Sequence, residues 1–153
     1  MKYLLNIPTM STLELKYVNS VIKQNWLTIK GDHTQSFEKK FAKLVNRKFS
    51  IALQSGTAAL HTALKALGVK KNDKVFIPNY SCVSTISCLS QLGASPIILD
   101  IENETLGLDF NLLKSAYKKH KAKFLQLVHV YGCPARDTNK IIQFCKKNKI
   151  KVL

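Results

Sequence analysis

The residues best placed to do chemistry lie between a short apolar run and a helical pattern. Phe49–Leu53 reads as a β-strand, and Gly56–Leu67, which follows it, has the apolar spacing of a helix. Ser55, Gly56 and Thr57 therefore occupy the first turn of a helix, where free N–H groups and the helix dipole favour an anion. Glycine lets a ligand approach the backbone, and the threonine hydroxyl adds a donor. The pattern predicts either a phosphate-binding turn or a plain N-cap in which Ser55 or Thr57 bonds its own helix.

Other candidate residues are weaker. The segment Gln54–Leu60 is neither G-x-G-x-x-G nor a Walker loop, which counts against a dinucleotide or ATP. His129 follows an apolar strand, where ligands of parallel sheets gather, but a hydrogen-bonded structural histidine is the favoured interpretation. His61 lies inside the helix after the turn and is expected to be packed or half exposed. Asp100 ends a strand and is expected to bond loop amides. Paired carboxylates, a Ser-His-Asp order and a metal triad are absent from the sequence.

The elements that must position these residues alternate regularly. Residues 1–48 form a predicted N-terminal helical segment, with helices at 11–24 and from a cap at Thr34. Residues 49–153 form a predicted α/β domain, in which short apolar runs alternate with helical periods. Such alternation predicts a three-layer α/β fold, a mostly parallel sheet with helices on both faces. The elements expected in this domain are strands at 49–53, 74–78, 96–100, 124–130 and from 150, and helices at 56–67, 81–92, 110–120 and 138–148.

Charge raises the question of a polyanion partner. The chain has 24 basic and 9 acidic residues, a formal net charge of +15. Arginine, the residue favoured for bidentate phosphate and base contacts, occurs only as Arg47 and Arg136. The lysines stand in short groups, without the block of like charges typical of a binding tail. The favoured interpretation is a solvated lysine-rich surface, and nucleic acid is not expected as a partner.

Composition and cysteine usage are those of a cytoplasmic protein. Hydrophobic residues make up 46% of the 153 residues, but the longest apolar runs are far below the ~20 residues that span a bilayer. No membrane partner is therefore expected. Cys82, Cys88, Cys133 and Cys145 form no C-x-x-C pair and no zinc spacing with histidine. Free buried thiols are predicted, and no metal site.

Several blocks in a fixed order resemble the DegT/DnrJ/EryC1/StrS family, which consists of pyridoxal-phosphate-dependent sugar aminotransferases of fold type I. One block alone would be weak, but their order and spacing match over nearly the whole chain. The blocks are 25–31 (NWLTIKG) with 37–41 (FEKKF), 54–61 (QSGTAALH), 73–78 (DKVFIP), 93–100 (GASPIILD) and 128–135 (VHVYGCPA).

The resemblance implies pyridoxal 5'-phosphate as the cofactor and assigns roles to four residues. Gly56, Thr57 and Ala58 match the positions that hold the cofactor phosphate, in agreement with the helix-terminus argument. Cys82 stands where the family has an aromatic side chain stacked on the pyridine ring. A thiol offers less surface and no π-face, so this departure puts the stacking contact in doubt.

The resemblance also places the catalytic groups elsewhere. The family's aspartate at the pyridine nitrogen follows the strand that begins here at Ile150, and its Schiff-base lysine comes later, so both are expected beyond Leu153. The chain ends within an apolar strand, which indicates a truncated chain. The resulting prediction is an N-terminal fragment of an aminotransferase that transfers an amino group, typically from glutamate, to the keto group of a nucleotide-linked sugar. The parent is expected to be a homodimer, and the fragment inactive by itself. The alternative is a basic α/β module that binds nucleic acid or another polyanion.

Overall fold

The computed structural model of the chain describes residues 7–26, 28 and 31–153, which form two compact units, Met1–Ala52 and Leu53–Leu153. Of the predicted segment 25–31, positions 27, 29 and 30 lie outside the described residues. Among the described helices, none combines the length and the apolarity that crossing a bilayer requires.

The first unit contains two amphipathic helices, α1 (Thr12–Lys23) and α2 (Asp32–Leu44). Ser11 is the N-cap of α1: its hydroxyl accepts from the Leu13 amide at 3.2 Å, while Glu14 accepts from the Ser11 amide at 2.7 Å. Helix α2 begins at Asp32, not at Thr34. Gly31 is its N-cap, and the aspartate in its first turn complements the helix dipole.

The second unit carries the sheet. Its helices are α3 (Gly56–Leu67), α4 (Ser84–Leu92), α5 (Phe110–His120) and α6 (Thr138–Lys147), with a short 3-10 turn at Val130–Gly132. Its strands are β1 (Lys74–Pro78), β2 (Ser95–Leu99), β3 (Phe124–Leu125) and β4 (Lys151–Val152).

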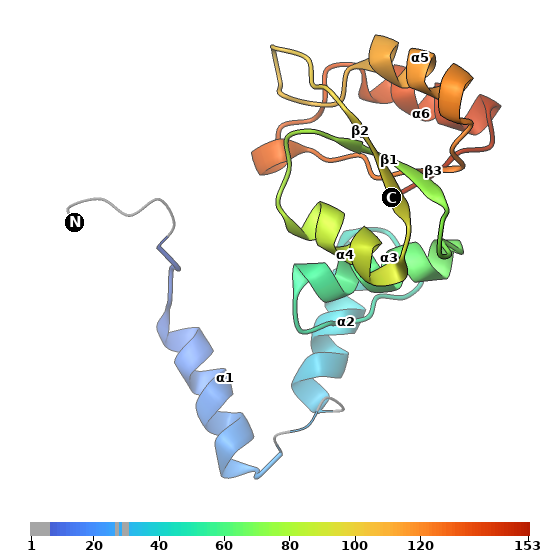
Figure 1. The fold of residues 1–153 in the computed structure, drawn as a ribbon. Helices are drawn as coiled ribbons and strands as arrows, with labels where there is room; N and C mark the ends of the chain where they lie inside the picture. The colour runs from blue at the N-terminus through green and yellow to red at the C-terminus, as the bar shows by residue number, and fades with distance from the viewer. Residues whose placement is uncertain (1–6, 27, 29–30) are drawn as a thin grey trace. The chain divides into compact units, whose positions relative to one another are not determined.

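All four strands are parallel and lie in the order β2-β1-β3-β4. Helices α3 and α4 cover one face of the sheet, and α5 and α6 cover the other (Figure 1). The three-layer α/β fold predicted from the alternation of elements is therefore confirmed. Because the strands are parallel, the carboxyl ends of all four meet at one edge of the sheet, and their amino ends meet at the opposite edge.

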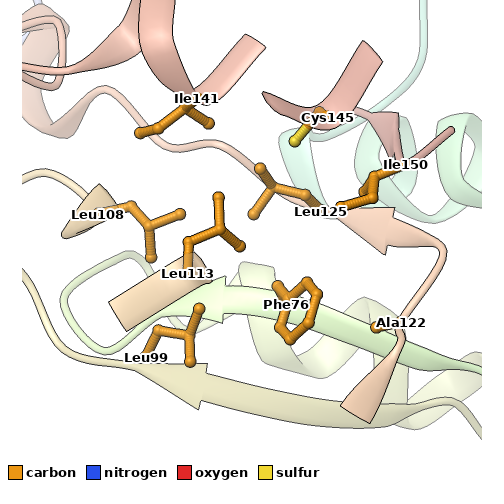
Figure 2. Packing of buried hydrophobic residues seen from close by; sticks show 9 residues of the cluster. All are labelled: Phe76, Leu99, Leu108, Leu113, Ala122, Leu125, Ile141, Cys145 and Ile150. Atoms are coloured by element: carbon orange, nitrogen blue, oxygen red, sulfur yellow. The ribbon is translucent and has the colours of Figure 1, made fainter. Parts of the chain in front are cut away.

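Side chains alternate between the two faces along β1. Phe76 points toward α5 and α6 and packs with Leu113 and Ile141, as Figure 2 shows. Val75 and Ile77 pack on the opposite face against α3 and α4. Helices on both faces thus explain why the strands read as nearly continuous apolar runs.

Besides α2, three predicted elements differ from the structure by more than one residue. Phe49–Leu53 forms no strand in the described part of the chain, because no neighbouring strand pairs with it, and Phe49 and Ile51 are each 75% exposed. Helix α4 begins at Ser84, not at 81. The Asn79 amide bonds the Leu99 carbonyl at 2.7 Å, which holds the chain in the strand direction beyond Pro78. Strand β3 is shorter than the predicted 124–130, although the Leu127 amide still bonds the Leu153 carbonyl at 2.8 Å.

Candidate functional site

The predicted anion site lies at the start of α3. Ser55 has extended backbone angles and is the N-cap, and its hydroxyl accepts from the Ala58 amide at 3.2 Å. The Ser55 carbonyl accepts from the Ala59 amide at 3.0 Å. The plain-cap interpretation therefore holds for Ser55, and this contact engages the Ala58 amide.

Two donors of the first turn remain available. No partner within the described residues accepts from the amides of Gly56 or Thr57. A Cβ at Gly56 would meet no atom within 4 Å, so the backbone is open to an approaching group. Two free amides, a threonine hydroxyl and the positive end of a helix of 12 residues together suit a phosphate.

Cys82 lies at the same edge of the sheet, in the loop between β1 and α4. Its side chain is exposed, and so is that of Cys133, whereas burial was predicted for all four thiols. Hydrogen bonds from the hydroxyl and amide of Ser84 lower the pKa of the Cys82 thiol. No aromatic ring occupies this position, and Tyr80, two residues earlier, is 40% exposed. The start of α3 is thus better supplied with groups that could contact a ligand than the loop around Cys82.

The other candidate residues have structural partners. The His61 Nδ1 lies 2.9 Å from Gln91 Oε1, which joins α3 to α4. Asp100 accepts from the Ile101 amide at 2.9 Å, as expected of a loop-bonding aspartate. His129 Nδ1 accepts from the Ala135 amide at 3.2 Å. These contacts favour structural roles for all three residues.

A buried carboxylate at this edge escaped the sequence analysis. Glu102 is only 5% exposed and accepts from the amides of Glu104 at 2.8 Å, Thr105 at 3.1 Å and Gly107 at 3.1 Å. The Thr105 hydroxyl also donates to it, and this bond is the largest cause that lowers the pKa of Glu102 to about 2. Little in the sequence pointed to this residue, because an acid that begins a polar run such as 102–105 normally indicates an exposed loop.

The Glu102 loop supports the segment that follows β3. The Thr105 hydroxyl oxygen accepts from the Arg136 amide at 3.1 Å, and the Arg136 guanidinium pairs with Glu104 at 2.8 Å. Gly107 lies so close to Ala135 that an added Cβ would be 2.4 Å from the Ala135 Cβ. We conclude that Glu102 has a structural role: it holds the loop after β2 in the conformation that contacts residues 135–136. Among the described residues, no His, Cys, Asp and Glu side chains gather in a group that could hold a metal ion.

Comparison with known proteins identifies the family. The model of the DegT/DnrJ/EryC1/StrS aminotransferase family matches residues 8–153. The chain belongs to this family. GDP-perosamine synthase from Escherichia coli O157:H7 is 32% identical over 146 residues, which are 95% of this chain and 40% of that protein. The chain therefore spans about two fifths of the length of the relative that it matches.

Solved structures of similar proteins share the fold of this chain. GDP-4-keto-6-deoxymannose-3-dehydratase with a trapped PLP-glutamate geminal diamine superposes with a TM-score of 0.89 at 28% identity, over 99% of this chain and 40% of that one. The aminotransferase from Psychrobacter cryohalolentis gives a TM-score of 0.86 at 26% identity, over 96% of this chain and 37% of that one.

Proposed function

We propose that the chain is the phosphate-binding part of a pyridoxal-phosphate-dependent sugar aminotransferase. The observation that carries the proposal is the start of α3, where two amides have no partner among the described residues and the backbone at Gly56 is open to a ligand. The resemblance to the family puts the phosphate turn at this position. The proposed reaction moves an amino group, with glutamate as donor, to the keto group of a nucleotide-linked sugar. GDP-sugar enzymes among the relatives support this substrate class.

The described residues fit the cofactor's phosphate. The amides of Gly56 and Thr57 and the Thr57 hydroxyl would bind the phosphate oxygens, and Ser55 holds the turn by engaging the Ala58 amide. Ala58, without a free amide, would contribute backbone close to the phosphate. Cys82 would lie against the ring in place of the aromatic side chain. Pyridoxal phosphate, when bound, supplies the electron sink for amino transfer.

We assign no catalytic residue to this chain, because none of the chain's lysines lies in a segment that matches the family's Schiff-base motif. We expect the purified chain alone to give no amino transfer from glutamate to a keto-sugar nucleotide. Mass spectrometry of samples taken over many hours would test for the amino-sugar nucleotide product. Turnover by the chain alone would contradict the assignment.

A cytoplasmic homodimer is part of the proposal. Four free cysteines suit a reducing compartment. Exposed apolar side chains at the carboxyl edge of the sheet, with Val83 73% exposed and Tyr131 90% exposed, suit an interface between subunits at this edge.

The test is the replacement of Thr57 by valine, which keeps the side-chain shape and removes the hydroxyl. A hydrogen bond to a charged group contributes about 1.5–3 kcal/mol, so the affinity for pyridoxal phosphate and for inorganic phosphate should fall roughly tenfold or more. Equilibrium dialysis measures both without relying on activity.

The matched control is Thr62→Val, the same change on the exposed surface of the same helix. It should leave both affinities unchanged. Equal affinities in the two variants would show that Thr57 does not bind the phosphate, and would contradict the proposal.

A further inference from the structure

Three connections that lead from a helix into a strand share an unusual composition. They are residues 70–74 (KKNDK) before β1, 118–123 (KKHKAK) before β3 and 146–151 (KKNKIK) before β4. Together they hold 11 of the chain's 22 lysines and a single carboxylate, Asp73. Along the sequence these groups are far apart and look like an ordinary polar surface.

The fold brings the three connections to one place. Parallel strands begin at the same edge of a sheet, and β1, β3 and β4 are consecutive neighbours in it. Val75 is level with Phe124, and Phe124 is level with Lys151. With neighbouring strands about 4.8 Å apart, the three strand starts lie within about 10 Å of one another. We call this lysine-rich surface, formed by residues 70–74, 118–123 and 146–151, the basic end.

The charge of the basic end is not neutralised locally. Among the described residues, none of its lysines forms a salt bridge with a carboxylate. The Asp73 carboxylate accepts from the Lys70 backbone amide at 2.8 Å. Lys151 donates to the Leu67 carbonyl at 2.6 Å, where it caps the end of α3. The other acids of this unit lie elsewhere: Asp100, Glu102, Glu104, Asp109 and Asp137 follow the carboxyl ends of strands or begin helices at the opposite edge.

Helix stability explains only part of this pattern. Cations in the last turn of a helix stabilise its negative end, which accounts for basic residues in the last turns of α5 and α6. Lys121, Lys123 and Lys149 come after those helices and add repulsion among like charges. A concentration of lysines that lack carboxylate partners, beyond what the helix ends require, is typical of a surface that meets a polyanion.

We propose that the basic end docks on the phosphate backbone of duplex nucleic acid without reading its sequence. Lysine ammonium groups are hydrated point charges that suit phosphates, and the near absence of arginine argues against base-specific contacts. No large apolar side chain is exposed among these connections in the described chain, which disfavours insertion into a membrane surface and stacking on single strands. This surface lies at the opposite edge of the sheet from the proposed phosphate turn and does not depend on it.

The test uses the full chain in its native assembly and a random-sequence DNA duplex. Lys118, Lys119, Lys146 and Lys147 are exposed on helices α5 and α6 and would all be changed to glutamine, which keeps helix propensity. Affinity in about 0.1 M salt should fall at least tenfold, and the slope of log affinity against log salt should become shallower by about three. Fluorescence anisotropy over a salt series measures both quantities.

The control makes the same change of net charge in the first unit, where Lys16, Lys39, Lys40 and Lys43 are exposed on α1 and α2. These four lysines would also be changed to glutamine. The control should bind the duplex within about twofold of the unchanged chain. An equal loss in both variants would show that net charge, not the basic end, attracts the duplex, and would overturn the proposal.

Two further results would overturn it. One is tighter binding to vesicles of anionic lipid than to the duplex at the same salt concentration, which would assign the surface to a membrane. The other is undetectable binding to the duplex at low salt. Circular dichroism of both quadruple variants checks that neither has lost its fold.

Discussion

The two edges of the sheet are built differently, although both offer donors to an anion. At the carboxyl edge, polar groups are fixed by directional hydrogen bonds: Ser55 holds the α3 turn, and Glu102 gathers the amides of its own loop. At the basic end, the lysines project without carboxylate partners among the described residues. A site made of fixed amides should be sensitive to small changes of shape. A surface made of mobile charges should respond to the number of charges and to salt.

The largest expected effect is steric and lies at the carboxyl edge. Gly107→Ala would place a Cβ 2.4 Å from the Ala135 Cβ and 2.6 Å from its Cα, so backbone must move. Overpacking of this kind costs about 1–3 kcal/mol, and we expect the upper part of that range in urea unfolding. Lys119→Ala at the basic end should change the unfolding free energy by less than about 0.5 kcal/mol.

A double variant sharpens this result. Ala135→Gly combined with Gly107→Ala removes the contact between the two Cβ atoms but leaves the Cα of residue 135 in place. Only part of the lost stability should return. Full recovery of the unfolding free energy in the double variant, or an unchanged unfolding free energy in Gly107→Ala, would contradict this expectation. Either result would show that the carboxyl edge tolerates a change of shape as well as the basic end does.

The second effect depends on pH. Hydrogen bonds from Thr105 and neighbouring amides lower the pKa of Glu102 from 4.5 to about 2, so this carboxylate stabilises the fold fully above pH 4.5. That contribution should disappear as the pH falls from 4.5 to about 2. Glu102→Gln should therefore be less stable than the unchanged chain near pH 6, and the difference should shrink over this interval in urea titrations.

The control for Glu102 is Glu104→Gln, which removes an exposed carboxylate paired with Arg136. Because exposed ion pairs contribute little, this variant should stay close to the unchanged chain across the series. If the difference in unfolding free energy between Glu102→Gln and the unchanged chain did not depend on pH, the charge of the Glu102 carboxylate would not be what stabilises its loop.

The smallest expected effect concerns thiol reactivity and leaves the fold intact. Hydrogen bonds from Ser84 lower the pKa of the exposed Cys82 thiol, whereas desolvation raises the pKa of Cys145 to about 11. Iodoacetamide near pH 7.5 should label Cys82 well before Cys145, because the thiolate is the nucleophile. Peptide mass spectrometry over time measures the order. Prior addition of pyridoxal phosphate should slow labelling of Cys82 if it lies at the ring, and unchanged labelling would contradict that position.

Much of the fold could be predicted from local signals. The structure confirms the predicted bounds of α3, β1 and α5, since Ser55 and Gly68 delimit the first, apolar residues define the second and Asp109 caps the third. The segment Phe49–Leu53 was the largest failure, because an apolar pattern makes a strand only where another strand pairs with it, and none of the four described strands does. The open turn at the start of α3 was predictable because its parts are contiguous in sequence.

The sequence by itself determined most of the helices and strands, where α3 begins and that a glycine and a threonine stand in its first turn. These features depend on neighbours a few residues away. Only the tertiary structure decided that Glu102 is buried. The loop that donates its amides to this carboxylate packs against residues 135–136, which are distant in sequence. Tertiary structure also decided that three separate lysine groups form one surface. Pairing of β1, β3 and β4 in parallel brings their starts to a common edge, and strand order is set by contacts across the whole unit.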